Sequence, residues 1–313
     1  MKARFFPIFF FSVVFTSVAL ASEQIRVDPA IQNEEETEAC HSKLLTLDAT
    51  PTDPGHVEVD LAYSLRGGKF AWQTDAERYH RGTYLTHAWD VETYIGLYKD
   101  IDMAIFQSFY HLFDKNNNDN EVADEIDPLT GEAMEDTIGG PTHGGGRGDL
   151  GVMGRWRFYE NKEKKFELAY SPTVYLPTGR RSNLDHLGPG AGYVSFANNL
   201  IYTQEYKRFC WTLNTGYNVP LANSKKTGNY RGTWNFNAAA GYQLLSWLHP
   251  QMEVIYNHSF ENPGKGGKLV SVVAGAIIPA GDHLRFDLGV QQDVLGSNQD
   301  QLTTGIFRVA FAT

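Results

Sequence analysis

Beyond its first 21 residues, the 313-residue sequence contains no run of 18 consecutive apolar residues. A membrane-spanning helix needs roughly 20 of them, so the sequence predicts no transmembrane helix. Basic residues are also scarce, because 27 Lys and Arg stand against 37 Asp and Glu, for a formal net charge of −10. This balance argues against nucleic acid as a partner, since phosphate binding depends on Lys and Arg. With only two cysteines, Cys40 and Cys210, the chain offers a single possible internal disulfide.

Residues 1–21 have the features of a secretory signal peptide. Lys2 and Arg4 form a basic start, residues 5–20 are almost wholly apolar, and Ala19-Leu20-Ala21 offers a small-x-small cleavage site. The alternative, a membrane anchor, would need a longer apolar stretch, and no Cys follows the cleavage site as it would in a lipoprotein. We therefore expect export and cleavage after residue 21, which moves the formal charge from −10 to −12 because Lys2 and Arg4 are lost.

Alternation with a period of two dominates the rest of the chain, and it is clearest in residues 148–179. There Trp156 and Phe158 lie opposite Arg155 and Arg157, and a charged turn leads into a second alternating run. A period of two indicates a β-strand, and the turn makes the pair a hairpin. Such runs recur along the chain at 57–65, 89–98, 101–113, 150–159, 166–176, 192–206, 209–219, 232–244, 251–260, 269–278, 284–291 and 302–312.

The connections between these twelve runs alternate between long and short. Long ones, rich in Gly, Asn and Asp, follow the first, third, fifth, seventh, ninth and eleventh runs, and short ones follow the others. Outer-membrane barrels combine long extracellular loops with tight periplasmic turns. The pattern therefore predicts an all-β fold, a 12-stranded antiparallel transmembrane β-barrel over residues 55–313, closed so that no strand edge is unpaired in lipid. Inside the fifth run, Pro172 predicts a bulge or bend.

Residues 22–54 differ from the barrel region, since they are acidic, contain three prolines and show no sustained period. One interpretation is a loose periplasmic leader. The other is a plug-like segment that folds into the barrel, because Leu44, Leu45 and Leu47 give it apolar groups to bury. The sequence leaves both interpretations open.

The barrel interpretation turns the apolar face toward lipid and the polar face toward the lumen. Tryptophans lie in or near strand ends, where aromatic girdles sit: Trp72, Trp89, Trp156, Trp211, Trp234 and Trp247. The charged residues of the inward face are the candidate pore lining: Glu58, Asp60, Asp90, Glu92, Arg155, Arg157, Glu167, Arg285, Asp287 and Arg308. They either set the selectivity of a pore or pair with one another and stiffen the wall. Because the last strand closes against the first, Arg308 should lie near Glu58 or Asp60.

The two cysteines are candidates for a disulfide that pins the leader. Cys210 alternates with Phe209 and Trp211, which predicts an inward position just after a short periplasmic turn. The segment that carries Cys40 enters from the same side, and the periplasm is oxidising. A bond between the two would close a long loop and contribute roughly 3–5 kcal/mol.

A weak calcium pattern lies in the acidic segment that starts at Asp114. The residues at positions 1, 3, 5, 7 and 12 of an EF-hand-like loop are oxygen ligands: Asp114, Asn116, Asn118, Asn120 and Glu125. Position 6 is Asp119 where such loops need Gly, and no helices flank the segment, so a solvated surface loop is favoured. The Gly-rich segment around His143 lacks the strand–loop–helix context of a phosphate site and predicts a flexible loop.

A barrel that hydrolyses lipids with a Ser–His pair is a further alternative. Here His258 and Ser259 are adjacent in sequence, so strand geometry sends them to opposite faces. No catalytic residue and no cofactor is expected.

Three motifs in residues 148–179 resemble a known family: Gly148-Asp149-Leu150, Arg155-Trp156-Arg157-Phe158 and Leu176-Pro177-Thr178-Gly179. They resemble the outer-membrane barrels of the MetA pathway of phenol and aromatic meta-cleavage, a family related to the long-chain fatty-acid channels. The resemblance implies a monomeric barrel that passes small, mostly hydrophobic molecules. It covers the motifs of this hairpin and, as a strand pattern, residues 55–313. The chain ends at Thr313 and lacks the terminal Phe common in such barrels.

Together these features predict a channel in the outer membrane of a Gram-negative bacterium, through which small hydrophobic or aromatic compounds diffuse passively. The expected partners are the lipid bilayer, the small hydrophobic cargo and the barrel-assembly machinery. The main alternative is a non-transporting structural or surface-interaction barrel that acts through its extracellular loops, and a barrel lipid hydrolase is the third.

Overall fold

The computed structural model describes residues 43–114, 143–183, 186–222, 230–261 and 266–313. All of them belong to one compact unit, Ala39–Thr313. The predicted signal peptide at 1–21 and the first part of segment 22–54 lie outside the described residues. Within the described ranges, no helix is long and apolar enough to span a membrane.

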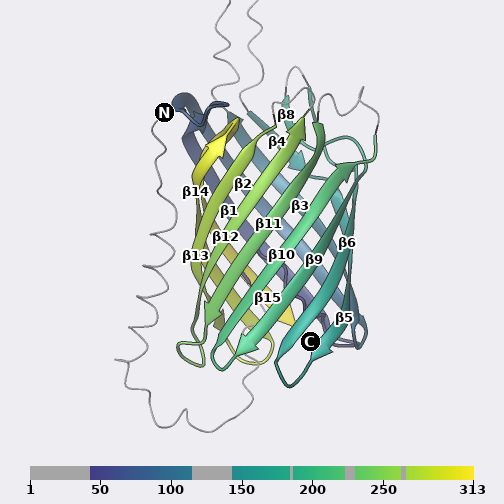
Figure 1. The fold of residues 1–313 in the computed structure, drawn as a ribbon. Helices are drawn as coiled ribbons and strands as arrows, with labels where there is room; N and C mark the ends of the chain where they lie inside the picture. The colour runs from purple at the N-terminus through teal and green to yellow at the C-terminus, as the bar shows by residue number, and fades with distance from the viewer. Residues whose placement is uncertain (1–42, 115–142, 184–185, 223–229, 262–265) are drawn as a thin grey trace, which may run out of the picture. The chain divides into compact units, whose positions relative to one another are not determined.

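Most of the strands form a single closed wall (Figure 1). The wall strands are β1 (Val57–Trp72), β2 (Arg78–Tyr98), β3 (Ile101–Asp114), β5 (Leu150–Asn161), β6 (Phe166–Leu176), β9 (Ser195–Tyr206), β10 (Phe209–Pro220), β11 (Tyr230–Tyr242), β12 (His249–Glu261), β13 (Lys268–Pro279), β14 (Leu284–Ser297) and β15 (Gln299–Ala312). Three short strands lie beside the wall at one end: β4 (His143–Arg147), β7 (Arg181–Asn183) and β8 (His186–Pro189).

The circle closes through the first strands of the barrel. β1 pairs with β15 from Glu58↔Ala312 to Trp72↔Gln299 and with β2 on its other side, and β2 in turn pairs with β3. All wall pairings are antiparallel, and every wall strand has two partners, so the sheet has no free edge. The predicted 12-stranded antiparallel barrel is therefore confirmed.

Successive side chains point to opposite sides of the wall, as strand geometry requires. On β1, Asp60 is 2% exposed and the next residue, Leu61, is 46% exposed. The outer face is apolar along every part of the circumference: Leu61, Leu65, Trp89, Val91, Ile105, Trp156, Phe158, Leu200, Leu213, Trp234, Phe236, Met252, Leu288, Val290, Phe307 and Phe311 are all exposed. The inner face carries small and polar residues, so the two faces of the wall divide as the alternation predicts.

The two ends of the barrel differ in their connections. Two-residue turns at Lys99-Asp100 and Lys207-Arg208 lie at the end where Glu58 pairs with Ala312, and we call this the turn end. The opposite end carries the connections from β3 to β5 and from β6 to β9, and we call it the loop end. Both termini of the barrel thus lie at the turn end, as an even number of strands requires.

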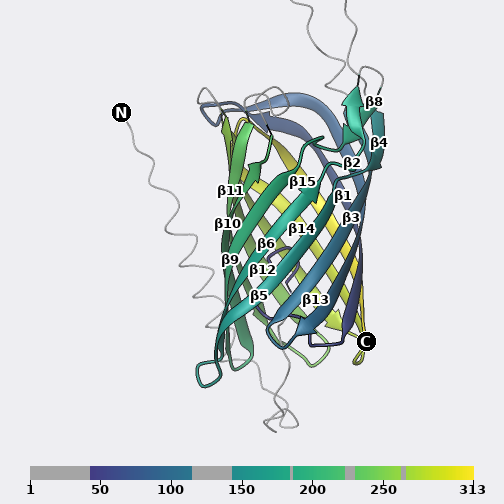
Figure 2. The same ribbon diagram turned by 90° about the vertical axis from the view of Figure 1, so that its right-hand side faces the viewer.

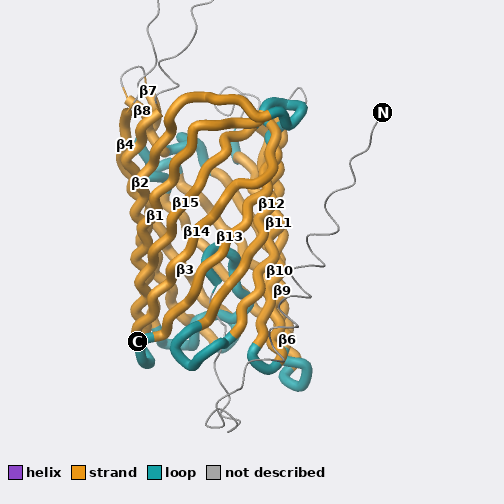
Figure 3. The backbone as a smooth tube through the Cα atoms, turned by 90° about the vertical axis from the view of Figure 1, so that its left-hand side faces the viewer, coloured by secondary structure: helices purple, strands orange, loops and turns teal. Residues whose placement is uncertain are grey.

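Two hairpins at the loop end have shorter connections than predicted. Between β1 and β2 only residues 73–77 are outside the strands, and between β14 and β15 only Asn298 is. The expectation of long connections here was wrong, because ladder hydrogen bonds extend the strands into segments whose glycines and polar residues weaken the alternation. Figures 2 and 3 show the β1–β2 hairpin bending over the rim at the loop end.

The predicted flexible loop around His143 is also wrong, because this segment forms β4. β3 continues past its partner β5, whose pairing ends at Phe106↔Gly151. The edge that remains is taken by β4, from Phe109↔Arg147 to Phe113↔His143. An unpaired ladder edge on β3, rather than a pattern within the glycine-rich segment, thus explains this strand.

Of the bulge or bend expected at Pro172, a bulge toward β9 does not form. β6 keeps one register with β9 from Phe166↔Gln204 to Tyr175↔Ser195, passing Pro172 without a shift. The register shift between β5 and β6 lies at Arg157/Tyr159 instead, close to the charged turn.

Candidate functional site in the barrel interior

Residues 43–53, here called the inner segment, precede β1 and lie inside the barrel. Leu44 is fully buried and packs in one apolar cluster with inward-facing residues of β12, β13 and β15: Ile255, Val273, Ile277 and Ile306. Further along, Ala49 is fully buried against Ala169 and Ile201. The inner segment therefore fills lumen space that the wall side chains of a twelve-stranded barrel leave open.

One carboxylate on β12 binds the start of the inner segment. Glu253, which is 1% exposed, accepts hydrogen bonds from the backbone N–H groups of Leu44 at 2.6 Å and Thr46 at 2.9 Å. The N–H of Leu45 and the hydroxyl of Thr46 point at the same carboxylate, at 3.1 Å and 2.8 Å. Hydrogen bonds to a buried ionised acceptor are among the strong ones, so Glu253 is the main anchor of this segment.

Other wall strands hold the remainder of the inner segment. The contacts are Thr203 Oγ1 with the Ala49 N–H at 3.1 Å, Glu167 with the Thr50 hydroxyl at 2.7 Å, Asp102 with the Thr52 N–H at 2.8 Å, Arg155 with the Asp48 carbonyl at 3.1 Å, Asn214 with the Leu47 carbonyl at 3.3 Å and Arg308 with the Leu44 carbonyl at 3.1 Å. Counted with Glu253, they come from β3, β5, β6, β9, β10, β12 and β15. The inner segment therefore crosses the lumen and is fastened on opposite sides of the wall.

A buried ion pair joins β3 to β5 at the level of the inner segment. Arg155 binds the carboxylate of Asp102 through two guanidinium nitrogens, and the side chains are 9% and 0% exposed. The same two residues also hold the backbone of the inner segment at Asp48 and Thr52. Arg155 and Asp102 therefore neutralise each other's charge and also hold the backbone of the inner segment.

A larger charge cluster spans the closure of the barrel between β1, β14 and β15. Arg285 lies 3.1 Å from Glu58, 3.5 Å from Asp60 and 3.1 Å from Asp287. Arg308 lies 3.7 Å from Asp60 and 3.4 Å from Asp287. Closure of the last strand against the first thus places Arg308 beside Asp60, and the pairs cross-link three strands.

A third group of charges lies at the turn end. Arg157 binds Asp100 of the β2–β3 turn at 2.8 Å and Glu167 of β6 at 2.5 Å. Glu167 also accepts a hydrogen bond from Thr50, which links this group to the inner segment.

Eight of the ten candidate pore-lining residues form ion pairs, and two do not form one among the described residues. Arg155, Arg157, Glu167, Arg285, Asp287, Arg308, Glu58 and Asp60 all form ion pairs. Asp90 and Glu92 alternate with the exposed Trp89 and Val91, so they face inward. In the part of the chain that the structure describes, neither forms an ion pair within 4.0 Å, and Glu92 accepts a hydrogen bond from Tyr94 at 2.8 Å.

Aromatic side chains form a second feature of the inner face, here called the aromatic column: Tyr94, Phe106, Tyr110 and Tyr175. They come from β2, β3 and β6 and share the inward face with Ala104 and Thr173. The rings of Phe106 and Tyr175 meet edge to face, with centroids 5.6 Å apart. All four are partly exposed, so the lumen offers ring faces and phenolic hydroxyls on the part of the wall that begins at β2, next to β1 of the charge cluster.

Cys210 faces inward and is fully buried near the turn end. The ammonium of Lys43 lies 3.2 Å from its sulfur. Cys40 lies outside the described residues, and the disulfide between the two stays a prediction.

Asp114 of the calcium pattern lies on β3, and the Ser–His pair lies on β12. Asp114 ends β3 and forms an ion pair with Arg81 at 2.6 Å, while Asn116, Asn118, Asn120 and Glu125 lie outside the described residues. His258 stacks on Phe260 with centroids 4.3 Å apart, and the Ser259 hydroxyl bonds Thr233 at 3.2 Å.

Sequence reasoning missed the residues that hold the inner segment. Glu253 alternates with Met252 and Val254, which was a signal for an inward carboxylate, but nothing in the sequence tells what it binds. Asp102 lies in a strand whose faces look similar, so its pairing with Arg155 had no signal. Lys43, Thr203 and Asn214 carry none either.

The fold of the described chain is similar to that of several solved outer-membrane proteins. The COG4313 outer membrane channel from Pseudomonas putida F1 has a TM-score of 0.70 at 10% identity, over 87% of this chain and 100% of that one. The translocator domain of autotransporter NalP from Neisseria meningitidis has a TM-score of 0.45 at 9% identity, over 83% and 89% of the two chains. The CymD monoaromatic hydrocarbon channel has a TM-score of 0.43 at 8% identity, over 84% and 89%. These similarities concern the fold alone.

No curated protein matches the sequence. A family model does match, and it spans residues 59–309, which is nearly all of the barrel. The chain therefore belongs to the family described as "Putative MetA-pathway of phenol degradation".

Proposed function

We propose that this protein is an outer-membrane channel through which small aromatic or hydrophobic compounds diffuse passively. The observation that carries the proposal is a closed wall, apolar outside and polar inside, whose lumen is occupied by the chain's own inner segment. A wall of this kind separates lipid from an aqueous interior. The family's link to phenol degradation and the fold shared with an outer membrane channel support the same function.

The aromatic column supports aromatic compounds as the cargo. A planar apolar molecule gains contact with the ring faces of Phe106 and Tyr175, and a phenolic hydroxyl finds hydrogen-bonding partners among the neighbouring tyrosines. Contacts of this kind are weak and repeated, which suits conduction, because a cargo must leave each position as readily as it enters.

Uptake by liposomes tests the cargo, with phenyltrimethylammonium as an aromatic probe whose fixed charge keeps it from crossing lipid and glucose as a non-aromatic solute. We expect Phe106→Ala to lower the flux of phenyltrimethylammonium and to leave that of glucose unchanged. The matched control is Phe109→Ala, since Phe109 lies on the same strand but faces outward with 45% exposure. Equal aromatic flux in all three proteins would remove the aromatic column from the proposal.

We further propose that the inner segment is a plug. Its contacts reach both sides of the lumen, and most of them are hydrogen bonds, so a local rearrangement can release it without unfolding the wall. Planar-bilayer recordings test this, and Glu253→Ala should raise the open probability of the full chain. The control Asp90→Asn removes an inward carboxylate that makes no hydrogen bond to the inner segment and should leave the open probability as it is. A barrel that stays sealed in both variants would favour a non-transporting function.

We propose in addition that Cys40 and Cys210 are joined, so that the plug is tethered at both of its ends. Lys43 already contacts Cys210, and the three residues back to Cys40 span at most about 11 Å, which is within reach of the same wall position. Mass spectrometry of the exported protein without reductant should find the two cysteine peptides linked. Two thiols that alkylate without prior reduction would contradict the tether and leave the channel itself untouched.

A further inference from the structure

Trp72 occupies an unexpected position for a tryptophan of an outer girdle, because it is only 7% exposed. Its ring lies against Gly296 of β14, at the place where a side chain of that residue would be. Gly296 pairs with Leu269 and follows Leu295, whose 64% exposure marks the outer face. Trp72 therefore covers the lumen side of β14, and the prediction that it belongs to an outer girdle was wrong.

Gln299 repeats this arrangement one strand further along. It pairs with Trp72 across the β1–β15 ladder, so the two side chains share a face. The side chain of Gln299 lies against Gly267, just before β13. Because glycines at 267 and 296 leave room, the ribbon made by the end of β1 and the starts of β2 and β15 packs inside the wall formed by β13 and β14.

The wall strands separate at a common level below this ribbon. Pairing between β14 and β15 ends at Gln292↔Thr303, although both strands continue. β1 shifts its register with β15 between Gly67 and Phe70 and with β2 between Gly68 and Phe70. Asp293 takes the place of the missing ladder by accepting a hydrogen bond from the Leu302 N–H at 3.0 Å. Bulges at one level on adjacent strands bend a sheet, so the ribbon bends along this line, here called the hinge line.

Beyond the hinge line, residues 69–81 form the cap hairpin, which pairs with β15 from Phe70↔Gln301 to Trp72↔Gln299 and has few polar side-chain contacts beyond that ladder. Arg81 forms ion pairs with Asp300 of β15 and with Asp114 of β3, the latter at 2.6 Å. At the tip, the Thr74 hydroxyl bonds Asn298 at 2.9 Å, and the Gln73 carbonyl accepts from the Asn298 N–H at 3.2 Å. Arg81 lies on β2, and its guanidinium reaches past β1 to Asp300 of β15 as well as to Asp114 of β3.

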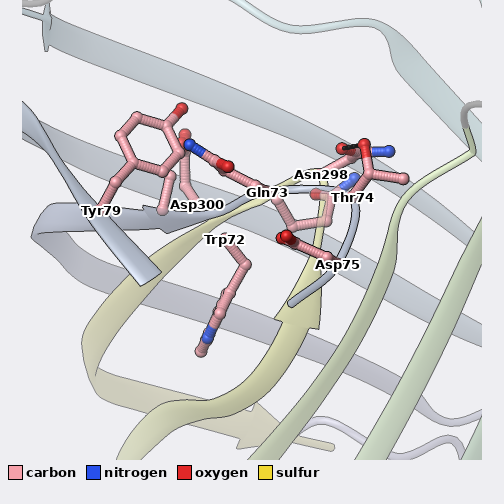
Figure 4. Close-up of a pocket in the computed structure, with 9 residues that line it drawn as sticks. Trp72, Gln73, Thr74, Asp75, Tyr79, Asn298 and Asp300 are labelled. Carbon is pink, nitrogen blue, oxygen red and sulfur yellow. Dashed lines mark hydrogen bonds between the residues drawn. The ribbon is translucent and has the colours of Figure 1, made fainter. Parts of the chain in front are cut away.

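The contact between the cap hairpin and the β14–β15 hairpin is tight where Trp72 lies on Gly296 and open nearer the tip. A pocket of about 750 Å³ lies there, lined by Ala71, Trp72, Gln73, Thr74, Asp75, Tyr79, Asn298, Gln299 and Asp300 (Figure 4). Most of these side chains are polar, so water can enter between the two hairpins. Apart from Ala71 and Trp72, the side chains of residues 69–80 are exposed, so the hairpin opens at lower cost than the wall.

We propose that the cap hairpin is a lid at the loop end of the barrel, hinged at residues 67–68 and latched by Arg81. The lid closes the end opposite the plug, so cargo passes only when both have moved. This gating role rests on the proposed channel function, but the movement of the lid can be measured without any transport.

Thiol labelling of the purified full-length protein tests the lid. Cys40 and Cys210 are replaced by Ser, and Thr304→Cys supplies one thiol at an inward-facing β15 position that is 3% exposed. Adding Arg81→Ala should raise the labelling rate with a water-soluble maleimide at least about fivefold, the change expected when a contact of this strength is lost. The control is Arg78→Ala, because Arg78 stacks on Phe70 of the same hairpin at 3.7 Å and makes no contact with the latch.

An equal labelling rate with and without Arg81 would overturn the proposal, as would an increase in the Arg78 control of the same size. Should Arg81→Ala fail to fold, the pair Thr74→Cys and Asn298→Cys in the same cysteine-free background gives the opposite test. Oxidation should then tie the tip and abolish the conductance of the Glu253→Ala channel, and reductant should restore it. Equal conductance in the oxidised and the reduced protein would contradict the lid. Absence of conductance in the reduced protein would instead contradict the channel function.

Discussion

The backbone of Leu44 donates a 2.6 Å hydrogen bond to the carboxylate of Glu253, a residue 209 positions further along the chain. This bond joins a segment without regular structure to the middle of a wall strand. It also places a buried carboxylate against three successive backbone N–H groups, those of Leu44, Leu45 and Thr46. Glu253 therefore accepts more hydrogen bonds from the inner segment than any other described side chain, and the proposed plug depends on it most.

Release of the inner segment should be visible to a protease. Lys43 is 4% exposed, so trypsin should not cleave after it in the intact protein. In Glu253→Ala the N–H groups lose their acceptor, and we expect cleavage after Lys43 in native conditions, read by mass spectrometry. Asp90→Asn should keep the protection. Protection that persists in Glu253→Ala would show that the apolar cluster around Leu44 and the other hydrogen bonds hold the segment without Glu253.

Loss of Arg155 should destabilise the barrel more than loss of Arg157. Asp102 is fully buried, and removal of its partner leaves an uncompensated charge, at a cost of about 3–5 kcal/mol. Arg157→Ala should cost less, because its partners Asp100 and Glu167 are 42% and 16% exposed and water can replace the guanidinium at both. Urea unfolding in lipid vesicles gives both free energies, and equal values would contradict the difference in burial.

The lumen should prefer cations because Asp90 and Glu92 are acidic without an ion-pair partner within 4.0 Å among the described residues. Neutralising both, as Asp90→Asn with Glu92→Gln, should lower the cation-to-anion permeability ratio by about fivefold, on the order of 1 kcal/mol in a partly solvated site. Reversal potentials across a salt gradient measure this in the Glu253→Ala channel. The control is Asp282→Asn, in the turn between β13 and β14, which should leave the ratio unchanged.

The outer face should tolerate charge according to its depth. Leu288 is 45% exposed in the body of β14, and Leu288→Arg should cost about 2–4 kcal/mol in a bilayer. Leu245 is 37% exposed in a turn at the end of the barrel, where the same change should cost about 0–1 kcal/mol. Folding into vesicles at increasing urea concentration compares the two. Similar costs would mean that the apolar belt does not meet lipid at Leu288.

Much of the wall was predictable because it rests on a local rule. Side chains of a strand alternate between two faces, so the sequence of β1 alone predicts that Asp60 faces the lumen and Leu61 faces outward. Turns such as Lys99-Asp100 are equally local, and closure of the barrel then follows because no strand edge can stay unpaired in lipid. Arg308 beside Asp60 is a consequence of that closure.

The sequence alone thus determined the barrel, its polar interior and its apolar exterior. Tertiary structure alone decided where the inner segment binds, which strands reach over the rim and what Trp72 covers. The physical reason is that these contacts join positions far apart in the chain, such as Leu44 with Glu253 and Trp72 with Gly296. No period within a strand encodes such pairs, because they depend on which inward positions meet once the wall has closed.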